Sequence, residues 1–109
     1  MRQFKFRALV TLDPPAPGRE VRQYPSETHN LMIHAWRIGD LSCDKYFPTV
    51  IACDADSPLQ QGERAVVTVT VAGDDALQYL GTGQPFTIWG ASAGHGVISR
   101  REFTDGQPS

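Results

Sequence analysis

The side chains with the greatest chemical reactivity in this 109-residue chain are two cysteines, three histidines and a few closely spaced serines and carboxylates. Ser92 and His95 are three residues apart in a glycine-rich segment, so they could in principle act as a nucleophile and its general base. No acidic residue lies nearby to orient the histidine. Asp74 and Asp75 are adjacent, and neighbours on a turn point apart instead of facing each other across a substrate. We therefore expect no catalytic residue and predict that the chain is not an enzyme.

The residue types that bind metals are present but poorly spaced. The zinc-ligand candidates are Cys43, Cys53, His29, His34 and His95. None of them forms the Cys-x-x-Cys or His-x-x-x-His pairs that place ligands side by side. The acidic segment at 54–56 is too short for a calcium loop of the helical-hand type and is typical of a solvated turn. We expect no metal site.

Residues 90–96 contain five glycines or alanines around Ser92 and resemble a loop that could hold a phosphate group. Such loops are followed by a helix whose first amides face the anion. The next residues, 97–99, are instead typical of a strand, so the segment is expected to be a hairpin turn. The Gly-x-x-x-x-Gly-Lys-(Ser/Thr) sequence of nucleotide-binding loops is absent. We expect neither a nucleotide nor any other cofactor.

The elements around these residues are predicted to be short strands. Apolar residues alternate with polar ones over 4–12, which predicts a strand whose inner face holds Phe4, Phe6, Ala8, Val10 and Leu12. Further strands are expected at 31–38, 46–53, 65–71, 86–89 and 95–103, with one helical turn at 75–80 for which Asp75 would be the N-cap. Residues 13–18 are a proline-rich loop, and 19–30 are expected to be irregular apart from a short strand near Val21. This pattern predicts an all-β fold, a six-stranded antiparallel barrel over residues 1–103, with a flexible tail at 104–109.

Composition limits the classes of partner. Ten Lys and Arg against twelve Asp and Glu give a net charge of −2, unlike the basic surface of a dedicated nucleic-acid binder. No apolar stretch is long enough to span a membrane, so no membrane contact is expected. The N-terminus lacks the apolar core of a signal peptide, which favours a cytoplasmic protein. In that compartment Cys43 and Cys53 are expected to be free thiols.

Several short sequence motifs resemble those of one known family. They are the opening Phe6-Arg7-Ala8-Leu9-Val10-Thr11-Leu12, the turn at Gly62, and the pair Pro85-Phe86-Thr87-Ile88 and Gly94-His95-Gly96-Val97-Ile98. Together they resemble the C-terminal β-barrel domain of elongation factor Tu and related translational GTPases. The resemblance implies a six-stranded barrel that, in the family, packs against a second barrel and a GTPase domain. A stand-alone copy would expose that interface, which implies a protein partner or self-association.

The chain also departs from the family. Residues 19–57 match poorly, and the family's Gly-Tyr-Arg-Pro-Gln-Phe segment has no clear counterpart. The family carries charged residues after its Phe-x-Ile strand, where this chain has Trp89-Gly90-Ala91-Ser92-Ala93. An arginine before the final Gly-x-Gly is also missing. These departures leave the family's tRNA-binding role open.

Tryptophan and arginine are the residues expected to bind a partner. Trp89 precedes the glycine turn and replaces a charged family position, so we interpret it as a surface anchor, with His95 and Arg100 on the same rim. Trp36 is a second candidate. The alternative is RNA binding by basic residues on one barrel face, with Tyr24 or Trp89 stacking on bases. The basic residues concerned are Lys5, Arg7, Arg22, Arg37, Arg100 and Arg101.

Overall fold

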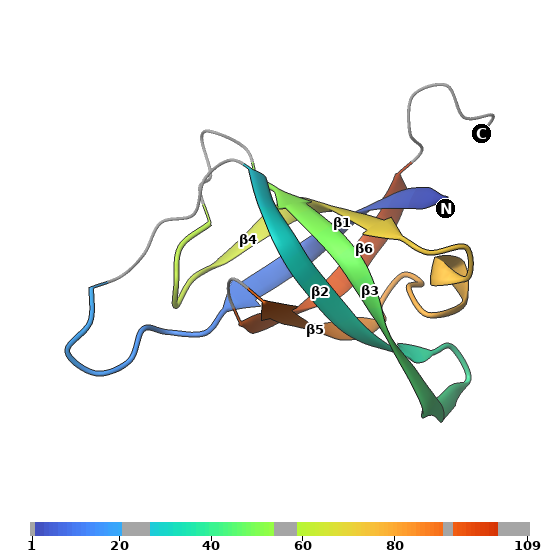
Figure 1. Ribbon diagram of the computed structural model, residues 1–109, viewed down its shortest axis with the longest axis horizontal. Helices are drawn as coiled ribbons and strands as arrows, with labels where there is room; N and C mark the ends of the chain where they lie inside the picture. The colour runs from blue at the N-terminus through green and yellow to red at the C-terminus, as the bar shows by residue number, and fades with distance from the viewer. Residues whose placement is uncertain (1, 21–26, 54–58, 91–92, 103–109) are drawn as a thin grey trace.

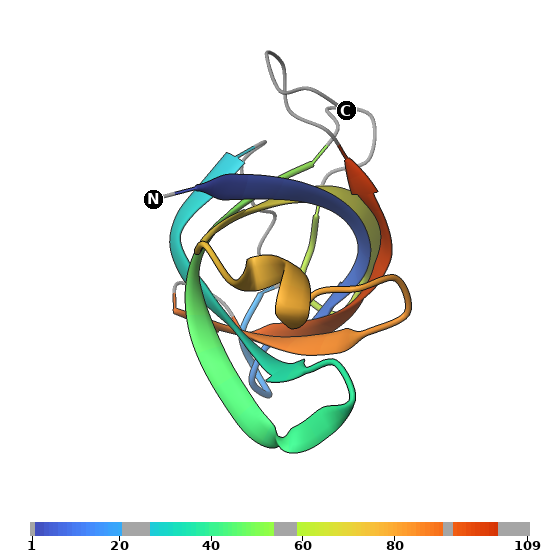
Figure 2. The same cartoon turned by 90° about the vertical axis from the view of Figure 1, so that its right-hand side faces the viewer.

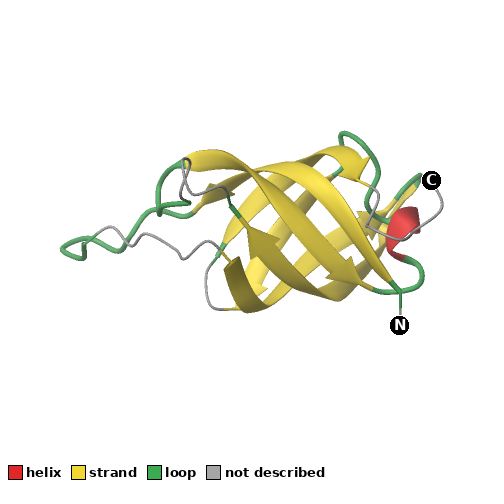
Figure 3. Ribbon diagram, turned by 90° about the horizontal axis from the view of Figure 1, so that it is seen from above, coloured by secondary structure: helices red, strands yellow, loops and turns green. Residues whose placement is uncertain are grey.

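A computed structural model describes residues 2–20, 27–53, 59–90 and 93–102. Six antiparallel strands close into a barrel in the order β1-β4-β3-β2-β5-β6 (Figures 1 and 3). The strands are β1 (Gln3–Leu12), β2 (Glu27–Arg37), β3 (Asp40–Ala52), β4 (Arg64–Ala72), β5 (Pro85–Gly90) and β6 (Gly94–Glu102). A single turn of 3-10 helix, η1 (Ala76–Gln78), follows β4. The predicted all-β, six-stranded antiparallel barrel is confirmed.

The inner face of β1 has the predicted composition. Phe4, Phe6, Ala8, Val10 and Leu12 are all buried, with at most 2 % of any side chain exposed. Successive side chains of a strand point to opposite faces, so this alternation places the intervening residues outside the barrel. β1 pairs with β4 on one side and with β6 on the other, and these two pairings help to close the ring.

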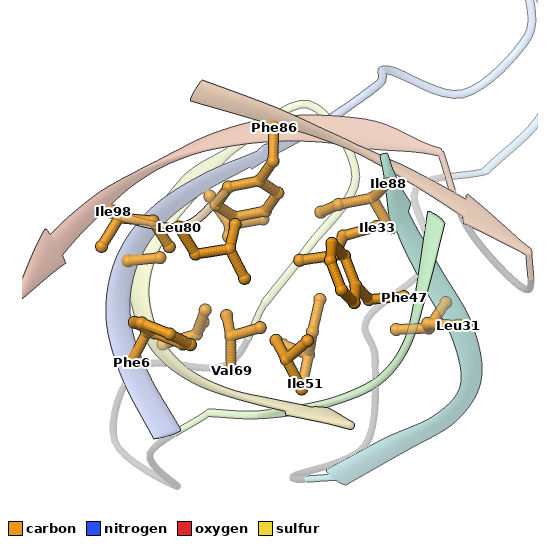
Figure 4. Packing of buried hydrophobic residues seen from close by; sticks show 14 of the residues in the cluster. Phe6, Leu31, Ile33, Phe47, Ile51, Val69, Leu80, Phe86, Ile88 and Ile98 are labelled. Atoms are coloured by element: carbon orange, nitrogen blue, oxygen red, sulfur yellow. The ribbon is translucent and has the colours of Figure 1, made fainter. Parts of the chain in front are cut away.

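The barrel interior is filled by its own side chains, as expected for six strands (Figure 4). Four phenylalanines are fully buried: Phe4, Phe6, Phe47 and Phe86. One buried polar side chain, Thr49, donates its hydroxyl to the Phe47 carbonyl oxygen at 2.9 Å. No helix in the described part of the chain has the length and hydropathy needed to cross a bilayer.

Gly96 allows close packing beside one of these phenylalanines. A Cβ atom at position 96 would lie 2.5 Å from Cζ of Phe86 and 3.0 Å from the Leu9 carbonyl oxygen. Only a residue without a side chain fits between the β1 backbone and this ring, because such contacts are far inside van der Waals distance. Gly96, in the family-like segment Gly94–Ile98, therefore has a packing role in the core.

Two strands are longer than predicted, and together they form a projecting arm. β2 begins at Glu27, four residues before its predicted start, and β3 begins at Asp40, six residues before. Gly39 adopts a φ of 83°, so a tight turn joins β2 to β3 and extends their pairing beyond the barrel. The prediction of an irregular segment at 27–30 was therefore wrong, and no strand was predicted over 40–45, because cross-strand pairing overrides the polar composition. Figure 2 shows this β2–β3 arm projecting beyond the barrel.

η1 confirms the predicted helical turn and covers one end of the barrel (Figure 2). Ala76 and Leu80 are buried there, and the Gln78 carbonyl oxygen accepts a hydrogen bond from Ile38 N–H at 2.8 Å. Asp75 occupies the N-cap position, as predicted, but its side chain makes no cap hydrogen bond. Its carboxylate binds Lys45 instead.

Some predictions fall on residues outside the described parts of the chain. They are the short strand near Val21, the acidic loop at 54–56, residue 103 and the tail at 104–109. Residues 91 and 92 of the glycine turn also lie outside them.

Candidate partner-binding face

The outer surfaces of β2, β5 and their neighbours carry a group of aromatic and apolar side chains. Alternate residues of these strands point outward, opposite the buried ones. We call this surface the aromatic face, and its members are Met32, His34, Trp36, Tyr46, Thr87, Trp89 and His95. In segment 31–38 both the inward-facing and the outward-facing positions hold apolar residues. The inward-facing residues enter the core, and Met32 and Trp36 belong to the aromatic face.

Trp89 is the most exposed aromatic side chain of the face. About half of it is accessible, 52 %, and its indole Nε1–H donates to Thr87 Oγ1 at 2.9 Å. That hydrogen bond satisfies the ring's one donor and holds the ring in place on the strand. Met32 lies directly opposite Trp89 in the β2–β5 pairing and is itself 39 % exposed. The pair therefore presents a continuous apolar surface to solvent.

His34 forms the centre of an aromatic stack next to this pair. Its ring lies 4.4 Å from that of Tyr46 at an interplanar angle of 7°, and 4.7 Å from that of Trp36. His34 Nε2–H donates to Asp44 Oδ2 at 2.5 Å, which fixes the ring orientation. Three rings on two strands are thus held against one another on the outer surface of the barrel.

The four sequence-predicted binding residues do not all gather at one place. Thr87 pairs with His95 across β5 and β6, so His95 is a diagonal neighbour of Trp89. Trp36 is on the same face, four residues along β2 from Met32. Arg100 pairs with Arg7 of β1, five residues along β6 from His95, or about 17 Å at ~3.4 Å per residue. His95 and Trp36 thus share the face of Trp89, and Arg100 lies elsewhere.

The basic residues considered for RNA binding are divided in the same way. Lys5 and Arg7 on β1 lie beside the end of β6 that carries Arg100 and Arg101. Arg7 Nη1 donates to Thr68 Oγ1 at 3.1 Å, and the Arg101 guanidinium lies 5.3 Å from the centre of the Phe4 ring. Arg37 is near the tip of the β2–β3 arm. Arg22 and Tyr24 lie outside the described residues.

The residues that could have bound a metal have other contacts. His34 is bonded to Asp44, and His29 lies beside Glu27 with Nε2 2.5 Å from Oε1. Cys43 and Cys53 are thiols and do not form a disulfide, as predicted, and Cys53 packs partly buried against the core. Within 2–20, 27–53, 59–90 and 93–102, no three His, Cys, Asp or Glu side chains come together as a metal would require.

Residues 90–94 read Gly-Ala-Ser-Ala-Gly and so match the Gly-x-Ser-x-Gly pattern in which esterases carry a nucleophile. In those enzymes the serine lies between a strand and a helix. Here β5 ends at Gly90 and the antiparallel strand β6 begins at Gly94. The segment is therefore flanked by two paired antiparallel strands and not by a strand and a helix, and Ser92 itself lies outside the described residues.

The acidic pair Asp74–Asp75 also has a structural setting. Lys45 Nζ contacts both carboxylate oxygens of Asp75, at 3.0 and 2.8 Å, and this hydrogen bond lowers the pKa of Asp75 and raises the pKa of Lys45. Asp74 Oδ1 accepts a hydrogen bond from the Arg2 backbone N–H at 2.9 Å. At the arm's tip, the Ser42 hydroxyl donates to Asp40 and lowers the pKa of that carboxyl.

No protein-family model, curated protein or solved structure matches this chain.

Proposed function

We propose that this protein is a non-catalytic β-barrel binding module that docks a protein partner through the aromatic face. The observation that carries the proposal is the exposed pair of Trp89 and Met32, which are opposite each other on neighbouring strands. Tryptophan is enriched among the residues that dominate protein interfaces, and methionine suits adaptable ones. The role of Trp89 is that of an anchor in a partner's pocket.

The order of the side chains supports a binding role. Trp89 is held by Thr87, and His34 is held by Asp44 and two aromatic neighbours. Rings fixed in this way lose little conformational entropy when a partner binds. Large apolar side chains that are exposed together usually indicate an interaction site.

We further propose that the chain is a stand-alone relative of the elongation factor Tu C-terminal barrel. The matched phrases and the closed barrel support this relationship. We also assign the protein to the cytoplasm, where its two free cysteines would stay reduced. The partner is another protein or a second copy of the chain.

Site-specific photo-crosslinking tests the proposed face. A photoreactive amino acid at His95 should capture a protein partner in host lysate, because His95 borders Trp89. The matched control places the same group at Val66, which is also exposed but belongs to β4, across the ring from β5. Equal capture from both positions would contradict a docking face centred on Trp89.

A second candidate function is RNA binding, and one pairing favours it. Arg7 and Arg100 lie opposite each other on β1 and β6, with Lys5 two residues away. Like charges in such a position are unfavourable, and an RNA phosphate beside them would relieve the repulsion. Salt separates the two functions, because phosphate contacts weaken steeply with ionic strength whereas an apolar contact does not.

A further inference from the structure

The β2–β3 arm leaves one edge of β3 without a strand beside it. β3 pairs with β2 at Asp40 and, beyond a break in register at 41–43, from Asp44 onward, but β4 joins it only over Thr49–Ala52. In the described part of the chain, residues 40–48 therefore have no strand partner on the side away from β2. Antiparallel strands direct about half of their N–H and C=O groups to each side, so this edge presents a series of backbone donors and acceptors.

A groove lies against this edge, where β4 departs. Residues 45–48 of β3 line one wall, and residues 72–75, which lead from β4 into η1, line the other. The groove has a volume of about 620 Å³. Gly73 is close to the β3 side, since a Cβ atom there would lie 2.7 Å from the Phe47 ring. The Lys45–Asp75 ion pair joins the two walls.

The charges along the groove select the kind of occupant. Lys45 is neutralised by Asp75. Asp74 also lines the groove, and its carboxylate accepts a hydrogen bond from the Arg2 backbone N–H, which leaves its negative charge in place. The nearby Arg2 guanidinium lies over the Phe4 ring, 5.0 Å from its centre. The edge therefore complements a segment that carries positive charge.

A second copy of the chain is a poor occupant. Two copies of the whole edge paired about a two-fold axis would place Asp44 opposite its own copy. Like charges directly opposite each other on paired strands are destabilising. Charged residues and a proline such as Pro48 also limit association between identical edges.

We propose that a basic, extended segment of a partner protein adds to residues 40–48 of β3 as an antiparallel strand. The added backbone pairs with the free edge, and its Lys or Arg side chains lie near Asp74. Pro48 has no N–H group, so the pairing ends there, beside the point where β4 begins to pair. This site shares Tyr46 with the aromatic face but does not depend on the role of Trp89.

The test uses a fluorescein-labelled six-residue peptide of alternating lysine and valine. Fluorescence anisotropy measures its binding to the full-length protein, and amide hydrogen exchange measures protection of residues 41–47. We expect binding together with slower exchange of these amides. The same peptide with N-methyl groups on alternate amides keeps its charge but cannot complete the pairing, so its binding should be lost. A glutamate–valine peptide should not bind.

Protein variants test the charge selection. Asp74→Asn removes a negative charge and should weaken binding roughly two- to fivefold, and Lys45→Gln removes the positive charge and should strengthen it by a similar factor. Asp13→Asn, an equally exposed carboxylate at the far end of β1, is the control and should have no effect. Absence of binding, equal binding of the N-methylated peptide, or binding without protection of residues 41–47 would each overturn the proposal.

Discussion

Trp89 of β5 and Met32 of β2 are directly paired across neighbouring strands, and both project outward from a fully packed barrel. Ile88 and Ile33, which are next to them in the two strands, are paired in the same way but are buried in the core. One ladder of hydrogen bonds thus fixes an apolar pair inside the barrel and another outside it. The inner pair stabilises the fold, and the outer pair remains available to a partner.

The first prediction tests whether Trp89 is a surface anchor for a partner or a residue of the core. Trp89→Ala should reduce partner binding while the melting temperature stays close to that of the wild type, because half of the ring is already in water. Phe86→Ala, three residues earlier in β5, should instead lower the free energy of unfolding by about 3–5 kcal/mol, since its ring is fully buried. Chemical denaturation of both variants measures the difference. A collapse in stability for Trp89→Ala would show that the residue belongs to the core.

A second prediction concerns Gly96. Gly96→Ala should reduce the free energy of unfolding by about 1–3 kcal/mol, because the new methyl group meets the Phe86 ring and the Leu9 carbonyl oxygen. His95→Ala, at the exposed neighbouring position, serves as the control for any effect of alanine in β6. Thermal denaturation compares the two. Equal stability of Gly96→Ala and wild type would contradict the close packing at this position.

The third prediction follows from the Lys45–Asp75 pair. The pKa of Asp75 is lowered by Lys45, so the pair's contribution to stability is present above the unfolded-state pKa of Asp75 and is lost as pH falls through the lower, folded-state value. The pKa of Lys45 is raised by Asp75, so the contribution is also lost when pH rises through the folded-state pKa of Lys45. The melting temperatures of wild type and Asp75→Asn should differ at neutral pH and converge in strong acid. A difference that persists unchanged in acid would exclude the ion pair as its cause.

The fourth prediction distinguishes the two candidate functions by salt. Retention of a protein partner on the aromatic face should change little between low and moderate ionic strength, because apolar burial does not release counterions. Retention through Lys5, Arg7 and Arg100 should fall steeply over the same range. The double variant Arg7→Gln with Arg100→Gln should affect only the second kind of binding. Binding of the wild type measured at two salt concentrations decides between them.

The sequence predicted the barrel because its strand signals are local. β1 alternates strictly, and β4 is rich in the β-branched residues that suit a pleated surface. The arm was not predicted because residues 40–45 are mostly polar and have no strand pattern of their own. Their strand conformation depends on pairing with β2, which no local pattern records. The turn at Gly39, with its positive φ, was the one available signal.

The candidate site was only partly predictable for the same reason. Trp89, His95 and Trp36 could be selected by residue type, but Met32 and Tyr46 join them only through strand register. Arg100 lies five residues along β6 from His95, so the two residues do not share a rim. His34 belongs to the aromatic face through its stacking with Tyr46, which residue type alone does not reveal.

The most direct test of the docking function is affinity capture from host lysate with tagged wild-type protein and tagged Trp89→Ala, both treated with nuclease. The account predicts that the wild type retains a protein partner at moderate salt, that Trp89→Ala loses it, and that both proteins have the same circular dichroism spectrum. Retention that disappears with nuclease, or a partner held equally by Trp89→Ala, would contradict docking through the aromatic face.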